Sequence, residues 1–143
     1  MRYVRHGDTY VIRFEDDEVV PDRLLELLAA ESVTAGSLTG IGALRSVRIA
    51  YFDTDRREYL DMQVDEQLEV LALVGNVAVY QDQPLVHAHV TLGRRDGTTL
   101  GGHLRWGIVR PTLEVYLRVI PGRVERAIDP EYGLPSLDLK DRR

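Results

Sequence analysis

One stretch of this sequence, LVHAHVTLGRRDGTTLGGHLRWGIV (residues 85–109), contains three of the chain's four histidines and predicts a β-hairpin. His87 and His89 are two residues apart in a run that alternates with apolar side chains. Because successive side chains of a strand point to opposite faces, this spacing places both imidazoles on one face. The other face takes the apolar neighbours Val86, Ala88 and Val90.

The connection between the two strands of this hairpin can close in two ways, and the choice decides where His103 lies. A two-residue turn sets Val90 opposite His103, whereas a three-residue loop with Gly97 in the left-handed conformation sets His89 opposite His103. We favour the three-residue loop because only that register brings three imidazoles together, so this preference takes the functional hypothesis as a premise. A bulge at the glycine pair 101–102 would change the register again.

Imidazoles in this arrangement can converge on one metal ion. Cross-strand neighbours on one face have Cβ atoms about 5 Å apart, and same-face neighbours along a strand about 7 Å. Neutral imidazole binds zinc, copper, iron or nickel, and three protein ligands with an open fourth position are typical of a catalytic zinc site. The competing interpretation is that the histidines line a polar sheet face or make ordinary hydrogen bonds. We favour a divalent metal held by His87, His89 and His103.

The composition is that of one ordinary globular domain covering residues 1–143, with the last few residues, about 138–143, expected to form a frayed tail. The chain is 44% hydrophobic and 29% charged, and it has no cysteine, which excludes disulfides and thiolate metal sites. It has no apolar run of transmembrane length and no signal peptide, so the cytoplasm is the expected compartment and no membrane contact is expected.

The formal net charge of −5 argues against wrapping of nucleic acid by bulk electrostatics, because phosphate binding needs a basic face. A local basic patch is not excluded by the net charge. Arg94, Arg95 and Arg105 lie in the predicted hairpin and are the candidates for contact with an anion or a nucleic acid. The simpler interpretation is that they are mostly solvated charges.

The remaining pattern predicts an α+β domain in which a mostly antiparallel β-sheet packs against one main helix. Pro21 is well placed to begin a helix that runs to about Ser32. A glycine-spaced segment at 36–43 lacks the third glycine of a dinucleotide-binding motif, so we interpret it as a tight entry into the sheet. Strands are expected at Thr9–Phe14, which has edge character, and at Leu44–Phe52, Glu58–Gln63, Leu68–Tyr80 and Thr112–Ile120, after which the chain should continue as an extended arm.

The run at Leu68–Tyr80 is too continuously apolar for a half-exposed strand. It predicts a strand covered on both faces, with a bulge or kink at Gly75-Asn76. In a chain this short, a neighbouring subunit could supply part of that cover.

Two carboxylates in predicted strands, Glu69 and Glu114, are candidates for a role beside a metal. Each could be a ligand, a general base acting on metal-bound water, or an ion-pair partner of a nearby arginine. The ion pair, with Arg105, Arg110 or Arg118, is the simplest interpretation for either residue taken singly.

Four short motifs, taken in order, resemble the plant and prokaryote conserved (PPC) domain, which also occurs in plant nuclear proteins that carry an AT-hook. They are Gly40-Ile41-Gly42-Ala43, Leu68-Glu69-Val70-Leu71 followed by Gly75-Asn76, His87-x-His89, and Gly101-Gly102-His103-Leu104. The resemblance covers nearly the whole chain.

The resemblance implies a compact α+β domain that assembles into a homotrimer. It also implies a metal such as zinc on a histidine cluster, which carries over to His87, His89 and His103. In the plant relatives those histidines are generally replaced and DNA contact comes from a separate AT-hook. This sequence has no Arg-Gly-Arg-Pro hook, so the nuclear DNA-binding role is not carried over with the fold.

Three functions therefore compete. The first is a trimeric metal-binding domain, with zinc as the favoured ion, that has a ligand-binding or regulatory role. The second is a metal-dependent enzyme acting on a small molecule. The third is a DNA-binding or transcription-associated assembly module. We favour the first, because no recognisable acid–base pair accompanies the histidines and the net charge is acidic.

Overall fold

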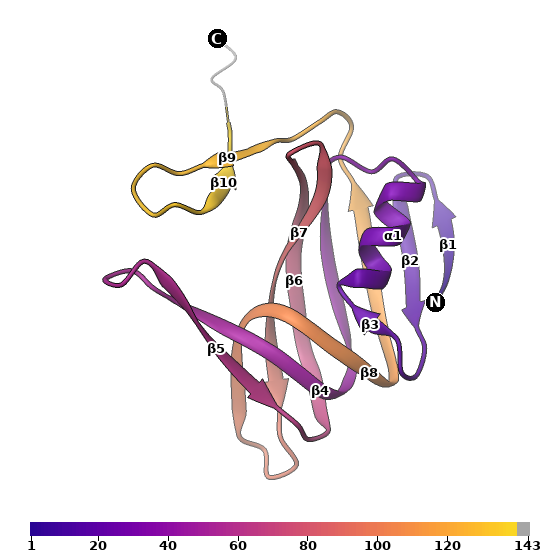
Figure 1. Cartoon of the computed structure of the whole chain (residues 1–143). Coiled ribbons are helices and arrows are strands. Elements are labelled where there is room, and N and C mark those ends of the chain that lie inside the picture. The colour runs from indigo at the N-terminus through magenta and orange to yellow at the C-terminus, as the bar shows by residue number, and fades with distance from the viewer. Residues whose placement is uncertain (140–143) are drawn as a thin grey trace.

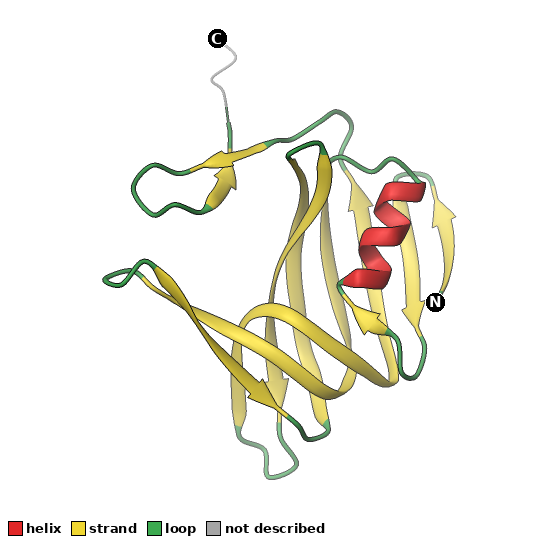
Figure 2. Ribbon diagram, in the orientation of Figure 1, coloured by secondary structure: helices red, strands yellow, loops and turns green. Residues whose placement is uncertain are grey.

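The computed structural model describes residues 1–139 and shows a mostly antiparallel β-sheet with one helix, as predicted (Figures 1 and 2). The elements follow one another as β1 (Arg2–His6), β2 (Thr9–Phe14), β3 (Val19–Val20), α1 (Asp22–Ala30), β4 (Gly36–Asp53), β5 (Glu58–Val64), β6 (Leu68–Tyr80), β7 (Gln83–Gly93), β8 (Thr99–Val119), β9 (Arg126–Ile128) and β10 (Pro135–Leu137).

The sheet closes on itself because its two longest strands are paired with each other. The strands lie in the order β1-β2-β8-β7-β6-β4-β5, and β4 also pairs with β8. The first part of β8 lies beside β7, and from His103 onward β8 lies beside β4. The strands β4, β6, β7 and β8 therefore form a ring in which neighbours are hydrogen-bonded all the way round.

Helix α1 covers one face of this sheet, which we call the inner face (Figure 2). Leu24, Leu27 and Leu28 point from the helix into the core and are buried. Because apolar residues three and four apart lie on one side of a helix, this spacing produces a single buried stripe. The sheet contributes the other half of the core, including Leu73, Val90 and Leu117.

The histidine hairpin closes through the three-residue loop, as predicted. The Arg94 backbone N–H donates to the Thr98 carbonyl at 2.9 Å, and the Gly97 N–H donates to the Arg94 carbonyl at 3.0 Å. Gly97 has φ +83°, the left-handed conformation that this loop requires. The resulting register pairs His89 with His103, and the glycine pair 101–102 follows without a bulge.

The face of the sheet that α1 does not cover carries a row of directly paired residues, His103, His89, Val74, Thr39 and Tyr116, which we call the outer row. Residues directly opposite each other in an antiparallel pair project from the same face. Val74 is 58% exposed and Tyr116 is 56% exposed. The prediction that Leu68–Tyr80 is covered on both faces is therefore wrong within the described chain.

Several predicted strand boundaries are wrong, because the observed strands are longer than expected. The segment 36–43 is part of β4 itself, and the second hairpin strand and Thr112–Ile120 are one continuous β8. The bulge in β6 lies between Val70 and Ala72, not at Gly75-Asn76. Gly75 is instead a site of close approach, because a Cβ there would lie 2.5 Å from the His87 carbonyl oxygen. Strand Thr9–Phe14 is covered by β1, so it is not an edge.

The expected extended arm after β8 forms a small hairpin of its own, β9–β10, which lies near the ends of β6 and β7 (Figure 1). A hydrogen bond joins the segment before β9 to β6, because the Val79 N–H donates to the Val124 carbonyl at 2.8 Å. Of the predicted frayed tail, residues 140–143 lie outside the described residues. Within residues 1–139, no helix is long and apolar enough to span a membrane.

Candidate metal centre

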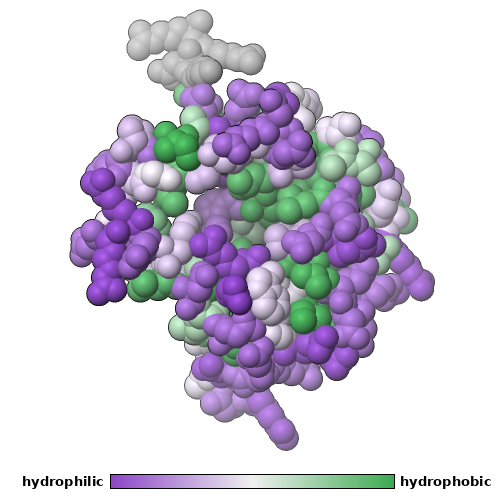
Figure 3. Space-filling model, viewed as in Figure 1, coloured by the Kyte–Doolittle hydropathy of each residue, from purple (hydrophilic) through white to green (hydrophobic). Residues whose placement is uncertain are grey.

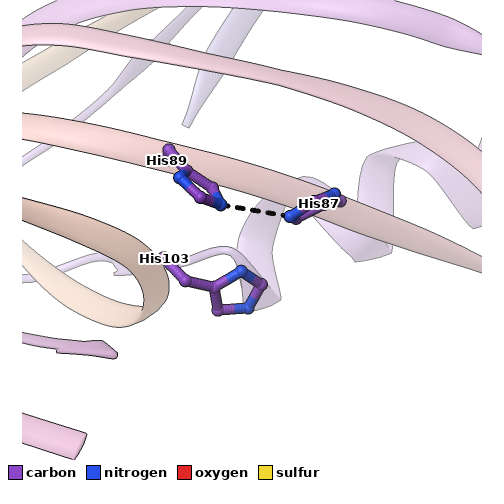
Figure 4. A group of neighbouring side chains, drawn as sticks. All are labelled: His87, His89 and His103. Atoms are coloured by element: carbon purple, nitrogen blue, oxygen red, sulfur yellow. Dashed lines mark hydrogen bonds between the residues drawn. The ribbon is translucent and has the colours of Figure 1, made fainter. Parts of the chain in front are cut away.

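The three imidazoles meet at one end of the outer row (Figure 4). His87 and His89 come from β7, where two-residue spacing places them on one face, and His103 comes from β8. The centroid of the His103 ring lies 5.1 Å from that of His87 and 5.5 Å from that of His89. One ring nitrogen from each residue can be chosen so that all three lie within 4.8 Å of one another.

The spacing of these nitrogens is close to what a metal ion needs. The Nε2 atoms of His87 and His89 are 3.2 Å apart. A tetrahedral zinc with Zn–N bonds of about 2.0–2.1 Å places its ligand atoms about 3.3 Å from one another. The separation of these two nitrogens therefore matches that of two ligands of one zinc ion.

The hydrogen bonding of His103 also fits a metal ligand. Its Nδ1 atom is buried and has no hydrogen-bond partner within the described chain. Burial, together with the charges of His87 and Arg105, lowers the pKa of His103 to about 4. Burial lowers the pKa of His87 as well. Both rings are therefore neutral at pH 7, which is the form that binds metals.

A cavity of about 620 Å³ opens beside the cluster. His87 and His103 form part of its wall, Tyr59 lies 5.1 Å from the His103 ring, and the C-terminal hairpin closes the opposite side. Figure 3 shows this face hollowed next to the hairpin, with apolar surface beside the hollow. A fourth ligand of a metal bound by the histidines could enter from this cavity.

The two carboxylates considered from the sequence lie away from the cluster. Glu69 pairs with Gly93, four residues along β7 from His89, which is roughly 13 Å at the usual strand rise. Glu114 lies on the distant part of β8, opposite Arg13 of β2. Within residues 1–139, the histidines are therefore grouped without a carboxylate ligand.

Within the described residues, Glu69 and Glu114 do not form the expected ion pairs. Each of the three arginines is paired with an aspartate instead. Arg105 pairs with Asp61 at 3.2 Å, Arg110 with Asp16 at 2.9 Å, and Arg118 with Asp8 at 3.5 Å.

Of the three candidate anion-binding arginines, only Arg105 lies at the cavity. Its guanidinium carbon is 4.1 Å from the centroid of the Tyr59 ring. Arg94 and Arg95 lie at the tip of the hairpin, where Arg94 pairs with Glu66 at 2.8 Å. The structure thus places Arg105 at the cavity and the other two candidates, Arg94 and Arg95, away from it.

Three further residues at the cavity were not identified from the sequence. Asn76 lies directly opposite His87 in β6, so the register of β6 against β7 would have pointed to it. Tyr59 and Arg126 come from β5 and β9. No local motif marks them, since only the folding of distant segments brings them beside the histidines.

Comparison with known proteins agrees with the fold. Residues 1–121 match the Plants and Prokaryotes Conserved (PCC) domain, the family named PPC above. Among curated sequences, the bifunctional protein GlmU from Synechococcus sp. (strain JA-2-3B'a(2-13)) is 30% identical over 134 residues, which are 92% of this chain. The chain spans 20% of the length of that relative.

Three solved structures superpose on nearly the whole chain. A PPC protein from Pyrococcus horikoshii is 30% identical, with a TM-score of 0.86 and coverage of 98% of this chain and 95% of its own. A metal-containing protein from Archaeoglobus fulgidus is 34% identical, with a TM-score of 0.87 and coverage of 92% and 93%. A protein from Bacteroides thetaiotaomicron, described as a candidate DNA-binding protein, is 28% identical, with a TM-score of 0.93 and coverage of 96% of each chain.

The order of the four motifs, the closed antiparallel sheet and the match over residues 1–121 lead to one conclusion. This chain belongs to the plants and prokaryotes conserved domain family.

Proposed function

We propose that this chain is a metal-binding PPC domain in which His87, His89 and His103 hold a divalent ion and a small molecule binds next to it. The observation that carries the proposal is the convergence of three ring nitrogens within 4.8 Å, beside which the Nδ1 of His103 is buried without a hydrogen-bond partner. The metal-containing relative from Archaeoglobus fulgidus supports it. We favour zinc because three neutral imidazoles with an open fourth position are a common zinc ligand set.

Ligand binding is favoured over catalysis because the described chain offers no free carboxylate beside the cluster. The Asp61 charge acts on His103, but Asp61 is itself paired with Arg105. A base for metal-bound water would need a carboxylate within hydrogen-bond reach of the ion. The metal would polarise a bound ligand, and the histidines would orient it.

Metal analysis of purified protein tests this proposal. Protein prepared without added metal should contain one ion per chain by inductively coupled plasma mass spectrometry, and the His89→Ala variant should lose it. His89 is exposed, so its removal should leave the core intact. His6→Ala is the matched control, because His6 is an exposed histidine of β1. Equal metal content in the His89 variant and wild type, or no metal in any sample, would contradict the proposal.

We also propose that the domain forms a homotrimer, as the family resemblance implies. The outer row supports this, because more than half of the surface of Val74 and of Tyr116 is exposed within residues 1–139. Light scattering should give about three times the chain mass of 16.2 kDa. Val74→Lys should shift the mass towards the monomer, whereas Met62→Lys, at an exposed methionine of β5, should not. A monomeric wild type would contradict the proposal.

DNA binding is a second candidate, favoured by the description of the Bacteroides thetaiotaomicron relative. The hairpin offers little free positive charge, since Arg94 is paired with Glu66 and Arg105 with Asp61. If the domain binds DNA through this hairpin, affinity for duplex DNA should fall steeply with salt and be lost in an Arg94→Ala/Arg95→Ala variant. Salt-independent or undetectable binding would exclude this candidate.

A further inference from the structure

Arg126 is a buried cation to which the described chain gives no carboxylate partner. The residue is 9% exposed. Its Nη1 donates to the Pro135 carbonyl at 2.8 Å and its Nη2 to the Asn76 Oδ1 at 2.5 Å. Its Nε is buried without a hydrogen-bond partner, and within residues 1–139 no carboxylate forms an ion pair with it. A buried charge is strongly unfavourable unless something compensates it.

A second arginine of the same cavity, Arg105, has its charge compensated in the usual way, by a carboxylate. Arg105 is paired with Asp61 at 3.2 Å and lies over the ring of Tyr59. Its charge is therefore balanced inside the protein. Arg126 has two neutral acceptors instead, and these orient the guanidinium without neutralising it.

Arg126 lies next to the proposed metal ligands. Asn76, which accepts its hydrogen bond, is the direct cross-strand partner of His87. Arg126, His87 and His103 all line the cavity of about 620 Å³. This volume lies within the range of small-molecule sites.

The rest of the cavity wall is largely apolar. It includes Leu85 and Leu104 from the sheet and Leu134 and Leu137 from the C-terminal segment. A ligand that fits this wall has a hydrocarbon part in addition to its charged group. A planar guanidinium matches the two oxygens of a carboxylate, so an organic acid suits the site better than a bare phosphate ion.

We propose that this cavity binds a small organic carboxylate, with its charged group held by Arg126 and its hydrocarbon part packed against the apolar wall. The inference rests on the proposed function in one respect, which is that it places the ligand beside the proposed metal. Arg126 is the residue that selects for negative charge, and His87 and His103 of the histidine cluster line the same cavity.

A titration of the purified, metal-analysed protein followed by NMR tests the inference. The probe is 3-methylbutanoate, and its uncharged counterpart of the same shape is 3-methylbutanamide. We expect wild type to bind the carboxylate at least tenfold more tightly than the amide and more tightly than inorganic phosphate. Equal affinity for carboxylate and amide, or tighter binding of phosphate, would overturn the inference.

Variants then assign the effect to Arg126. Arg126→Gln should weaken carboxylate binding at least tenfold and leave the metal content and amide binding unchanged. The exposed Arg118 provides the control, because Arg118→Gln should change neither. Should the Arg126 variant not fold, the wild-type comparison of carboxylate with amide still decides.

The outcomes separate this inference from the proposed function. Protein that contains metal but shows no preference for the carboxylate overturns the inference and leaves the metal centre standing. Protein without metal that still shows Arg126-dependent carboxylate binding supports the inference and contradicts the metal centre.

Discussion

The inner and outer faces of the sheet are built from the same strands but differ in what covers them. On β6, Leu73 points to the inner face and is 5% exposed, whereas Leu71, at the bulge between Val70 and Ala72, is 52% exposed. Helix α1 completes the inner face, and residues 1–139 leave the outer row of apolar and histidine side chains open. The inner face therefore forms the hydrophobic core, while the outer row stays accessible within residues 1–139.

The largest expected effect contrasts these two leucines. Leu73→Ala should lower the free energy of unfolding by about 2–5 kcal/mol, because it leaves a cavity in the packed core. Leu71→Ala should cost less than about 1 kcal/mol, because the side chain is already half in water. Urea denaturation of both variants measures the difference. Equal costs would show that the outer face is as well covered as the core, as full burial in an assembly would produce.

An intermediate effect concerns the turn of the histidine hairpin. Gly97→Ala should cost about 1–2 kcal/mol, because a residue with a side chain is strained at its φ of +83°. Metal content should stay unchanged, since the paired strands hold the register. Gly7→Ala is the matched control, at φ +60° in the β1–β2 turn. Loss of metal in the Gly97 variant alone would show that the turn itself determines which residues share the outer face.

The smallest expected effect is a pH dependence at the same turn. Hydrogen bonds from the Thr98 hydroxyl and the Thr98 N–H to Oδ1 lower the pKa of Asp96. A lowered carboxyl pKa contributes stability above the unfolded value of about 3.9, and that contribution is lost as the pH falls through the folded value. The urea midpoint of wild type should therefore exceed that of Asp96→Asn at pH 7, and the gap should close towards pH 2.5.

A gap between wild type and the Asp96 variant that widens at low pH would contradict the assigned role of the ionised carboxylate.

The local sequence pattern was sufficient to predict those features of the structure that depend on a few neighbouring residues. The alternation around His87 and His89 predicted a strand with both rings on one face, and loop chemistry at Gly97 allowed the register that pairs His89 with His103. Sequence did not reveal that β4 and β8 each run unbroken past a glycine-rich or proline-containing segment. Such segments usually end strands. The glycine segment of β4 is paired with both β6 and β8, whereas β8 is paired on either side of Pro111, at Val109 and Leu113.

The sequence by itself determined the fold class and a hairpin strand with His87 and His89 on one face, because each depends on side-chain periodicity over a short span. It allowed the three-residue loop that pairs His89 with His103, but it allowed a two-residue turn as well. Only the tertiary structure decided what stands beside those histidines. Arg126, Tyr59 and Asn76 come from three separate strands, and no periodicity links them. Their meeting depends on the closure of the sheet and on the docking of the C-terminal hairpin, which are set by packing between distant segments.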